Sequence, residues 1–98
     1  MAGNPVPIGG FGGALQQMLR ASGLGFLLHE TRLRERWEDV VGGPAAKIAA
    51  LDSLQGFVLH VKVEGAAWRQ ELHYQRDAIM KRANEVLGAD VVREVRLR

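Results

Sequence analysis

Cysteine is absent from this 98-residue chain, which excludes disulfide bonds, a thiol nucleophile and thiolate metal ligands. Aromatic residues make up only 6% of the sequence and are too scattered to form an aromatic stacking tract. No apolar run approaches the roughly 20 residues of a membrane-spanning helix. The opening Met-Ala-Gly-Asn-Pro has no Lys or Arg, which argues against a secretory signal peptide. We therefore expect a soluble cytoplasmic protein with no membrane partner.

Neither sign of charge dominates the sequence. Lys and Arg number 13 against 11 Asp and Glu, and the formal net charge of +2 permits binding to a polyanion without requiring it. A content of 47% hydrophobic and 24% charged residues is ordinary for a globular domain. A chain of this length supports one modest core. The placement of the charges must decide what the domain binds.

Glycine and proline are concentrated at the N-terminus, and residues 1–13 are predicted to be a flexible tail. Residues 14–98 are predicted to form one folded domain. Apolar residues recur every three or four positions from residue 14, again over 27–41 and again over 66–87, which predicts three helices. Pro44 is well placed to start a further short helical turn.

Alternating residues predict the strands. A hairpin is expected around Gln55-Gly56, followed by a last strand within 91–98. Because Arg93 breaks the alternation of that last strand, we expect a bulge or a late start there. The order α-α-β-β-α-β predicts an α+β fold in which helices back one face of a small sheet and water meets the other. In the second hairpin strand, one side holds Phe57, Leu59, Val61 and Val63, and the other holds His60, Lys62 and Glu64.

Four motifs carry a resemblance. Residues 36–42 read Arg-Trp-Glu-Asp-Val-Val-Gly, and residues 65–72, after the hairpin, read Gly-Ala-Ala-Trp-Arg-Gln-Glu-Leu. Residues 82–88 read Arg-Ala-Asn-Glu-Val-Leu-Gly, and residues 92–98 read Val-Arg-Glu-Val-Arg-Leu-Arg. Over roughly residues 14–98 the chain resembles the DciA family of bacterial replicative-helicase loaders. It departs from that family where members often carry a His-Thr pair, since Lys-Ile-Ala-Ala stands there instead.

The resemblance implies a domain similar to the KH fold that binds DNA, single-stranded or forked, and acts on the hexameric DnaB-type helicase. It implies a place in the initiation of DNA replication. KH domains usually clamp nucleic acid with a Gly-x-x-Gly loop, and none stands between the predicted helices. Any single-strand binding must therefore use another surface.

The cations differ in whether acids stand near them. Charges in the helix over 27–41 are paired three or four residues apart, which is typical of a solvated helix face. Arg69 and Arg76 have no such acid, and His73 lies between them along one edge of the last helix. If the last two strands are neighbours, further cations gather on the outward sheet face, and backbone contact of low sequence specificity is expected. The predicted nucleic-acid-binding residues are Lys62, Arg69, His73, Arg76, Arg96 and Arg98.

Trp37 and Trp68 both lie on apolar helical stripes, which favours core packing for each. Trp is also a preferred contact residue at protein interfaces, so a partly exposed tryptophan would be a contact for the helicase. Trp68, at a helix start, is the better candidate for exposure. Both remain candidate partner-binding residues.

Catalytic patterns are missing from the sequence. His29, His60 and His73 lack metal-type spacing, and Ser22 and Ser53 have no nucleophile-elbow context. There is no P-loop to hold ATP. We therefore expect no enzyme activity, metal or cofactor. Two alternatives to a DNA-binding helicase adaptor stay open: a KH-like RNA-binding or ribosome-associated module, and a structural domain that forms a homodimer through its sheet face.

Overall fold

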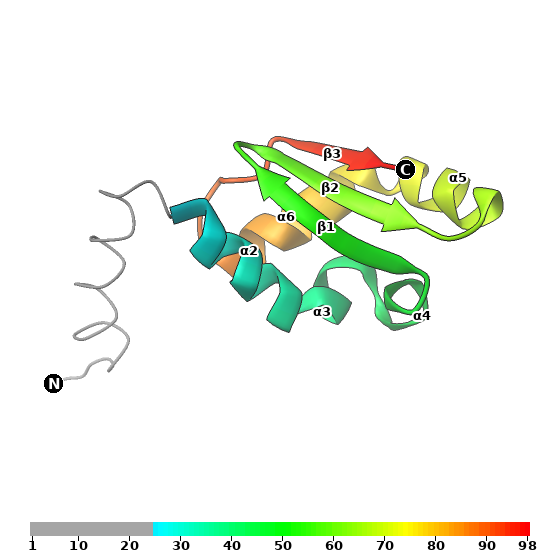
Figure 1. Ribbon diagram of the computed structural model, residues 1–98, viewed down its shortest axis with the longest axis horizontal. Coiled ribbons are helices and arrows are strands. Elements are labelled where there is room, and N and C mark those ends of the chain that lie inside the picture. Colours follow the sequence, from blue (N-terminus) through cyan, green and yellow to red (C-terminus); the bar gives the residue numbers. More distant parts are fainter. Residues whose placement is uncertain (1–24) are drawn as a thin grey trace, which may run out of the picture.

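The computed structural model describes residues 25–98, so the predicted tail and the helix predicted from residue 14 lie outside the described residues. The described elements confirm the α+β class, with helices before the first strand and between the second and third strands (Figure 1). In chain order they are α2 (Gly25–Glu35), α3 (Trp37–Val41), α4 (Gly43–Ala46), β1 (Ala49–Gln55), β2 (Val58–Val63), α5 (Ala66–Tyr74), α6 (Arg76–Leu87) and β3 (Glu94–Leu97).

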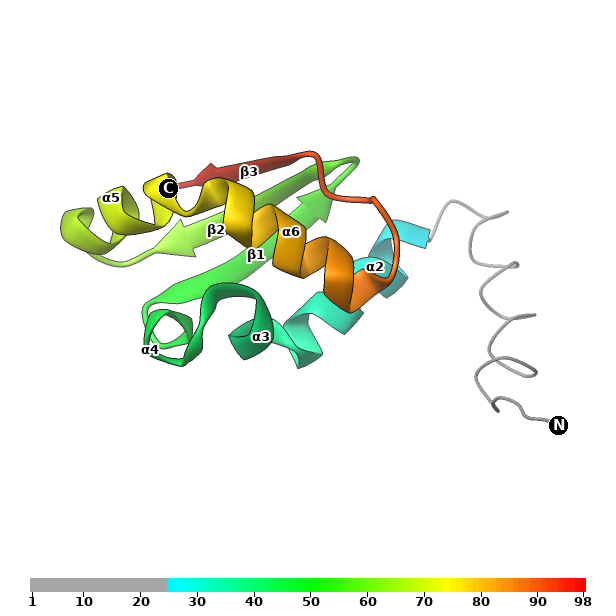
Figure 2. The ribbon, with the colours of Figure 1, turned by 180° about the vertical axis from the view of Figure 1, so that it is seen from behind.

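The three strands form one mixed sheet in the order β1-β2-β3. β1 and β2 pair antiparallel as the expected hairpin, whereas β3 pairs parallel to β2 after the crossover through α5 and α6. α6 lies across one face of the sheet, and α2, α3 and α4 run along the β1 side (Figure 2). No helix within residues 25–98 covers the other face of the sheet.

The buried core lies between the sheet and the helices that back it. Leu59, Val61 and Val63 of β2 are buried, and Lys62 is exposed, as the alternation predicts. Phe57 does not join the inward residues. It lies in the turn before β2, is 47% exposed and packs its ring under the Arg93 guanidinium at 4.5 Å. The prediction of an inward Phe57 is wrong because the strand begins only at Val58.

Two predicted helices are each divided. The helix expected over 66–87 breaks at Gln75, whose N–H donates to the carbonyl of Leu72 three residues back at 3.0 Å and whose φ and ψ are −96° and 10°. The helix expected over 27–41 breaks at Arg36. Neither break stands at a glycine or a proline. The break at Gln75 ends α5, which contacts β2 and β3.

The last strand starts late, after Arg93, which confirms the second of the two expectations, a bulge or a late start. The backbone N–H groups of Arg93 and Glu94 both donate to the carbonyl of Phe57, at 2.9 and 3.2 Å, and strand pairing begins at Glu94. Pro44 lies in the short helix α4, also as expected.

Candidate nucleic-acid and partner interfaces

Side chains from the first helices fasten the free edge of β1. Glu30 accepts the N–H of Leu54 at 2.8 Å, and Arg34 donates to the carbonyls of Leu51 and Asp52 at 2.7 and 2.9 Å. The register shifts between Leu51 and Ser53, so Asp52 is the extra residue of a bulge. The bulge fixes the position of a carboxylate that lies on the outer side of the sheet.

Trp37 belongs to the same fastening. Its indole Nε1–H donates to the carbonyl of Ala49 at 2.7 Å, and the half-buried ring packs against the core. Trp37, which stands in the first of the family-like motifs, therefore joins α3 to the start of β1.

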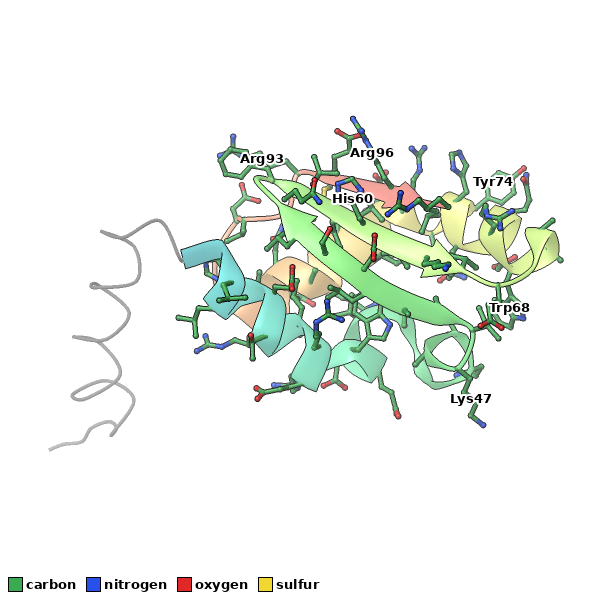
Figure 3. The ribbon with its side chains drawn as sticks, in the orientation of Figure 1. Lys47, His60, Trp68, Tyr74, Arg93 and Arg96 are labelled. Carbon is green, nitrogen blue, oxygen red and sulfur yellow. The ribbon has the colours of Figure 1, made fainter. Side chains whose placement is uncertain are left out.

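The outer face of the sheet carries four of the basic side chains. His60 and Arg96 are register partners on β2 and β3, Lys62 lies on the same face of β2, and Arg98 follows β3 (Figure 3). We call Lys62, Arg96, Arg98 and His60 the cationic face. Lys62 has no acidic partner among the described residues.

Two acids neutralise part of this cationic face. The Arg96 guanidinium pairs with Glu94 at 2.7 Å, and both side chains are at least half exposed. Arg98 reaches across β2 and pairs with the Asp52 carboxylate of β1. Each arginine is thus held in place by an exposed acid from within the sheet.

Arg69 and Arg76 contact neutral acceptors instead of acids. Arg69 Nη2 donates to the carbonyl of Val63 at 3.2 Å, and Arg76 Nε donates to the carbonyl of His73 at 3.0 Å. The N–H of Val63 bonds in turn to the carbonyl of Arg98, so Arg69 lies where the cationic face ends. Arg69 Nε is the one buried side-chain nitrogen or oxygen within residues 25–98 that lacks a hydrogen-bond partner.

One side of α5 forms a groove with the end of β3. The groove is open to solvent and has a volume of about 500 Å³, and its residues include Tyr74, which is 75% exposed. Tyr74 is not among the binding residues predicted from the sequence; its position next to His73 was the available signal. We call this feature the α5 groove, and it is lined by Ala66, Arg69, Gln70, His73, Tyr74 and Leu97.

The opposite side of α5 carries the exposed tryptophan. Trp68 is 38% exposed and, with Ala67, Glu71 and Gln75, lines a shallow depression of about 420 Å³. Gln75 donates to Glu71 at 2.9 Å across this surface. Trp68 and Tyr74 project from different sides of the helix (Figure 3). We call the four residues the Trp68 face.

Two further residues of the family-like motifs hold the scaffold. Arg82 donates to the carbonyl of Val40 at 2.7 Å, which ties α6 to α3. The Asn84 side chain accepts the N–H groups of Val91 and Val92 at 3.0 and 2.7 Å and donates to the Val92 carbonyl at 3.0 Å. Asn84 therefore shapes the crossover that places β3.

The motif glycines have a backbone role. Gly42 and Gly65 have φ of 96° and 94°, in the region that side-chain-bearing residues rarely adopt, and each precedes a helix. Trp68 and Glu71 are different, since both are exposed and, among residues 25–98, neither side chain has a hydrogen bond to the backbone.

No cluster of three His, Asp or Glu side chains suited to a metal ion occurs in the part of the chain that the structure describes. Within the same residues, no helix combines the length and the apolar character needed to cross a membrane.

The comparisons with known proteins identify the family. No curated protein matches the chain. The family model for DciA, described as the Dna[CI] antecedent, matches residues 10–97, which is nearly the whole sequence. The chain therefore belongs to the DciA family, and its role is related to the loading of the DnaB-type replicative helicase.

Proposed function

We propose that this protein is a non-enzymatic DNA-binding adaptor that assists the loading or operation of the DnaB-type helicase at the start of replication. The observation that carries the proposal is the separation of two surfaces: cations on the sheet and the α5 groove, and an exposed tryptophan on the other side of α5. A KH-like relationship and a cytoplasmic location at the nucleoid are part of the same proposal and rest on the family resemblance, whereas a homodimer formed through the sheet face belongs to the alternative function of a structural domain.

Charge supports the DNA-binding part. Lys62, Arg69 and Arg76 have no carboxylate partner in residues 25–98, so their charge is available to a phosphate backbone. Each neutralised phosphate releases condensed counterions, which makes such binding fall steeply with added salt. Point cations contact the backbone rather than base edges, so weak sequence preference is expected.

Exposure supports the helicase-binding part. Leu72 is the only buried residue of α5, so this helix presents most of its surface outward. An exposed tryptophan beside a small residue and a hydrogen-bonded Glu71–Gln75 pair fits an anchor at a protein interface. Trp37, whose indole hydrogen bond is internal, would contribute by supporting the scaffold.

Because the sequence has no P-loop, loading would draw on binding energy rather than on ATP hydrolysis by this chain. The adaptor would bind an open or DNA-engaged helicase ring more tightly than a closed one and so shift the ring toward that state. Equal affinity for both states would shift nothing.

The test is capture of purified DnaB-type helicase by the immobilised protein. Wild type should retain the helicase, and Trp68→Ala should lose most of it while keeping DNA affinity. Tyr74→Ala, an aromatic truncation on the other side of α5, is the matched control and should retain the helicase. Wild-type protein that ignores the helicase would contradict the adaptor function.

DNA binding is tested separately by fluorescence anisotropy at several salt concentrations. A steep loss of affinity with salt is expected. Salt-independent binding, or binding to RNA alone, would favour the alternative functions.

A further inference from the structure

The α5 groove differs from the rest of the basic surface because its walls are mixed. Tyr74 supplies an aromatic ring, Ala66 and Leu97 supply apolar surface, and Gln70 and Arg69 supply hydrogen-bond donors. Its volume of about 500 Å³ lies within the roughly 300–1,000 Å³ of small-ligand pockets. Such a groove suits a flat ring with a polar edge better than it suits an extended phosphate chain.

Tyr74 is held from one side and open on the other. Gln70 donates to its hydroxyl at 3.0 Å, and the His73 ring meets it edge-on at a centroid distance of 6.3 Å and an angle of 74°. The residue is nevertheless 75% exposed. An aromatic ring that is oriented but uncovered is the kind of platform on which unpaired bases stack.

Arg69 has a donor to spare at the same place. Its Nη2 is occupied by the carbonyl of Val63, whereas its Nε is buried without an acceptor. Buried donors are almost always satisfied, so a missing partner requires an explanation. A small shift of the guanidinium toward a phosphate oxygen in the groove would satisfy this donor.

We infer that the α5 groove seats one unpaired base of a DNA strand against the Tyr74 ring, with an adjoining phosphate at Arg69. The strand then continues over the cationic face toward Arg98 and Lys62. This inference rests on the proposed DNA binding and adds the site at which the protein distinguishes single-stranded from duplex DNA. A base within a duplex is stacked on both sides, so it reaches the ring only at the cost of leaving its stack.

The test uses a 20-nucleotide oligothymidylate with one central 2-aminopurine, whose fluorescence is quenched on stacking, and its duplex with a complementary strand. Tyr74→Leu should lower single-strand affinity about tenfold, in line with the loss of one stacked base, and should abolish the quenching. Duplex affinity should stay unchanged. Tyr74→Phe, which keeps the ring, should behave as wild type. Trp68→Leu removes an exposed aromatic from the other side of α5 and should also leave DNA binding unchanged.

Four results would overturn the inference. If Tyr74→Leu leaves single-strand affinity and quenching unaltered, no base binds in the groove. In that case, a loss of affinity in Lys62→Glu would still support the proposed DNA binding by the cationic face. An equal loss on both DNA forms would assign Tyr74 to general contact. Loss of helicase capture with intact DNA affinity would assign the groove to a protein segment. If wild type binds neither DNA form, the proposed function fails as well.

Discussion

Arg98 and Asp52 form an ion pair that spans the width of the sheet, from the end of β3 over β2 to the bulge of β1. The two residues lie 46 positions apart in the sequence. The pair holds a cation in place on the cationic face, and at the same time it places a carboxylate where a DNA phosphate would bind.

Removing that carboxylate should strengthen DNA binding. Asp52→Asn is expected to raise affinity about two- to fivefold at low salt, because an exposed ion pair of this kind is worth up to about 1 kcal/mol and the freed Arg98 can pair with phosphate. Fluorescence anisotropy with a short oligonucleotide measures the change. Asp39→Asn removes the same charge from the Arg36 pair on α3 and should change affinity far less. Equal gains in the two variants would mean that net charge alone is responsible.

Reversing the two arginines that lack acidic partners should have the opposite effect. Arg69→Glu together with Arg76→Glu is expected to abolish DNA retention in a gel shift while the far-UV circular dichroism spectrum stays that of a folded protein. Lys47→Glu together with Lys81→Glu makes the same change in net charge at exposed lysines elsewhere and should reduce binding only slightly. Since Arg69 is half-buried, Lys62→Glu with Arg76→Glu provides a second variant that leaves its contact with Val63 intact. Unchanged affinity in both double variants would remove these cations from the DNA site.

The strand topology accounts for the division between what the sequence predicts and what it does not. Alternation in β2 identifies its buried and outward residues, because period two is a local property of a strand. The pairing of Arg98 with Asp52 depends on β3 lying parallel to β2, which no local pattern specifies. The break at Gln75 likewise lacks a glycine or a proline, and without that break and the neighbouring β3, Tyr74 reads as one more residue of a long helix.

Asn84 should matter for stability rather than for binding. Asn84→Ala leaves the N–H groups of Val91 and Val92 without their side-chain acceptor, at a cost of about 1–3 kcal/mol in the free energy of unfolding. Denaturant titration followed by circular dichroism measures this loss. Asn84→Asp keeps an acceptor oxygen but replaces the amide donor by a carboxylate oxygen that faces Asp90 and the Val92 carbonyl, so it should not restore the stability of wild type. A variant as stable as wild type would mean that the crossover is held by other contacts.

Substitutions of the two tryptophans should differ in their effect on the free energy of unfolding, measured in the same way. Trp37→Phe keeps an aromatic ring but removes the indole donor to Ala49, and a loss of about 0.5–1.5 kcal/mol in the free energy of unfolding is expected. Trp68→Phe should leave that free energy almost unchanged, because the side chain is 38% exposed and its indole has no hydrogen bond within residues 25–98. If Trp68→Phe proved the more destabilising change, the Trp68 face would belong to the core rather than to an interface.

The α5 groove and the Trp68 face lie on different sides of the same nine-residue helix, α5. With its side chains, a helix is roughly 10–12 Å across. A strand lying in the groove and a ring subunit resting on Trp68 would therefore be brought within one helix diameter of each other, with no hinge between them. On this geometry the protein would act as a fixed spacer that delivers the strand to the rim of the ring at a set distance.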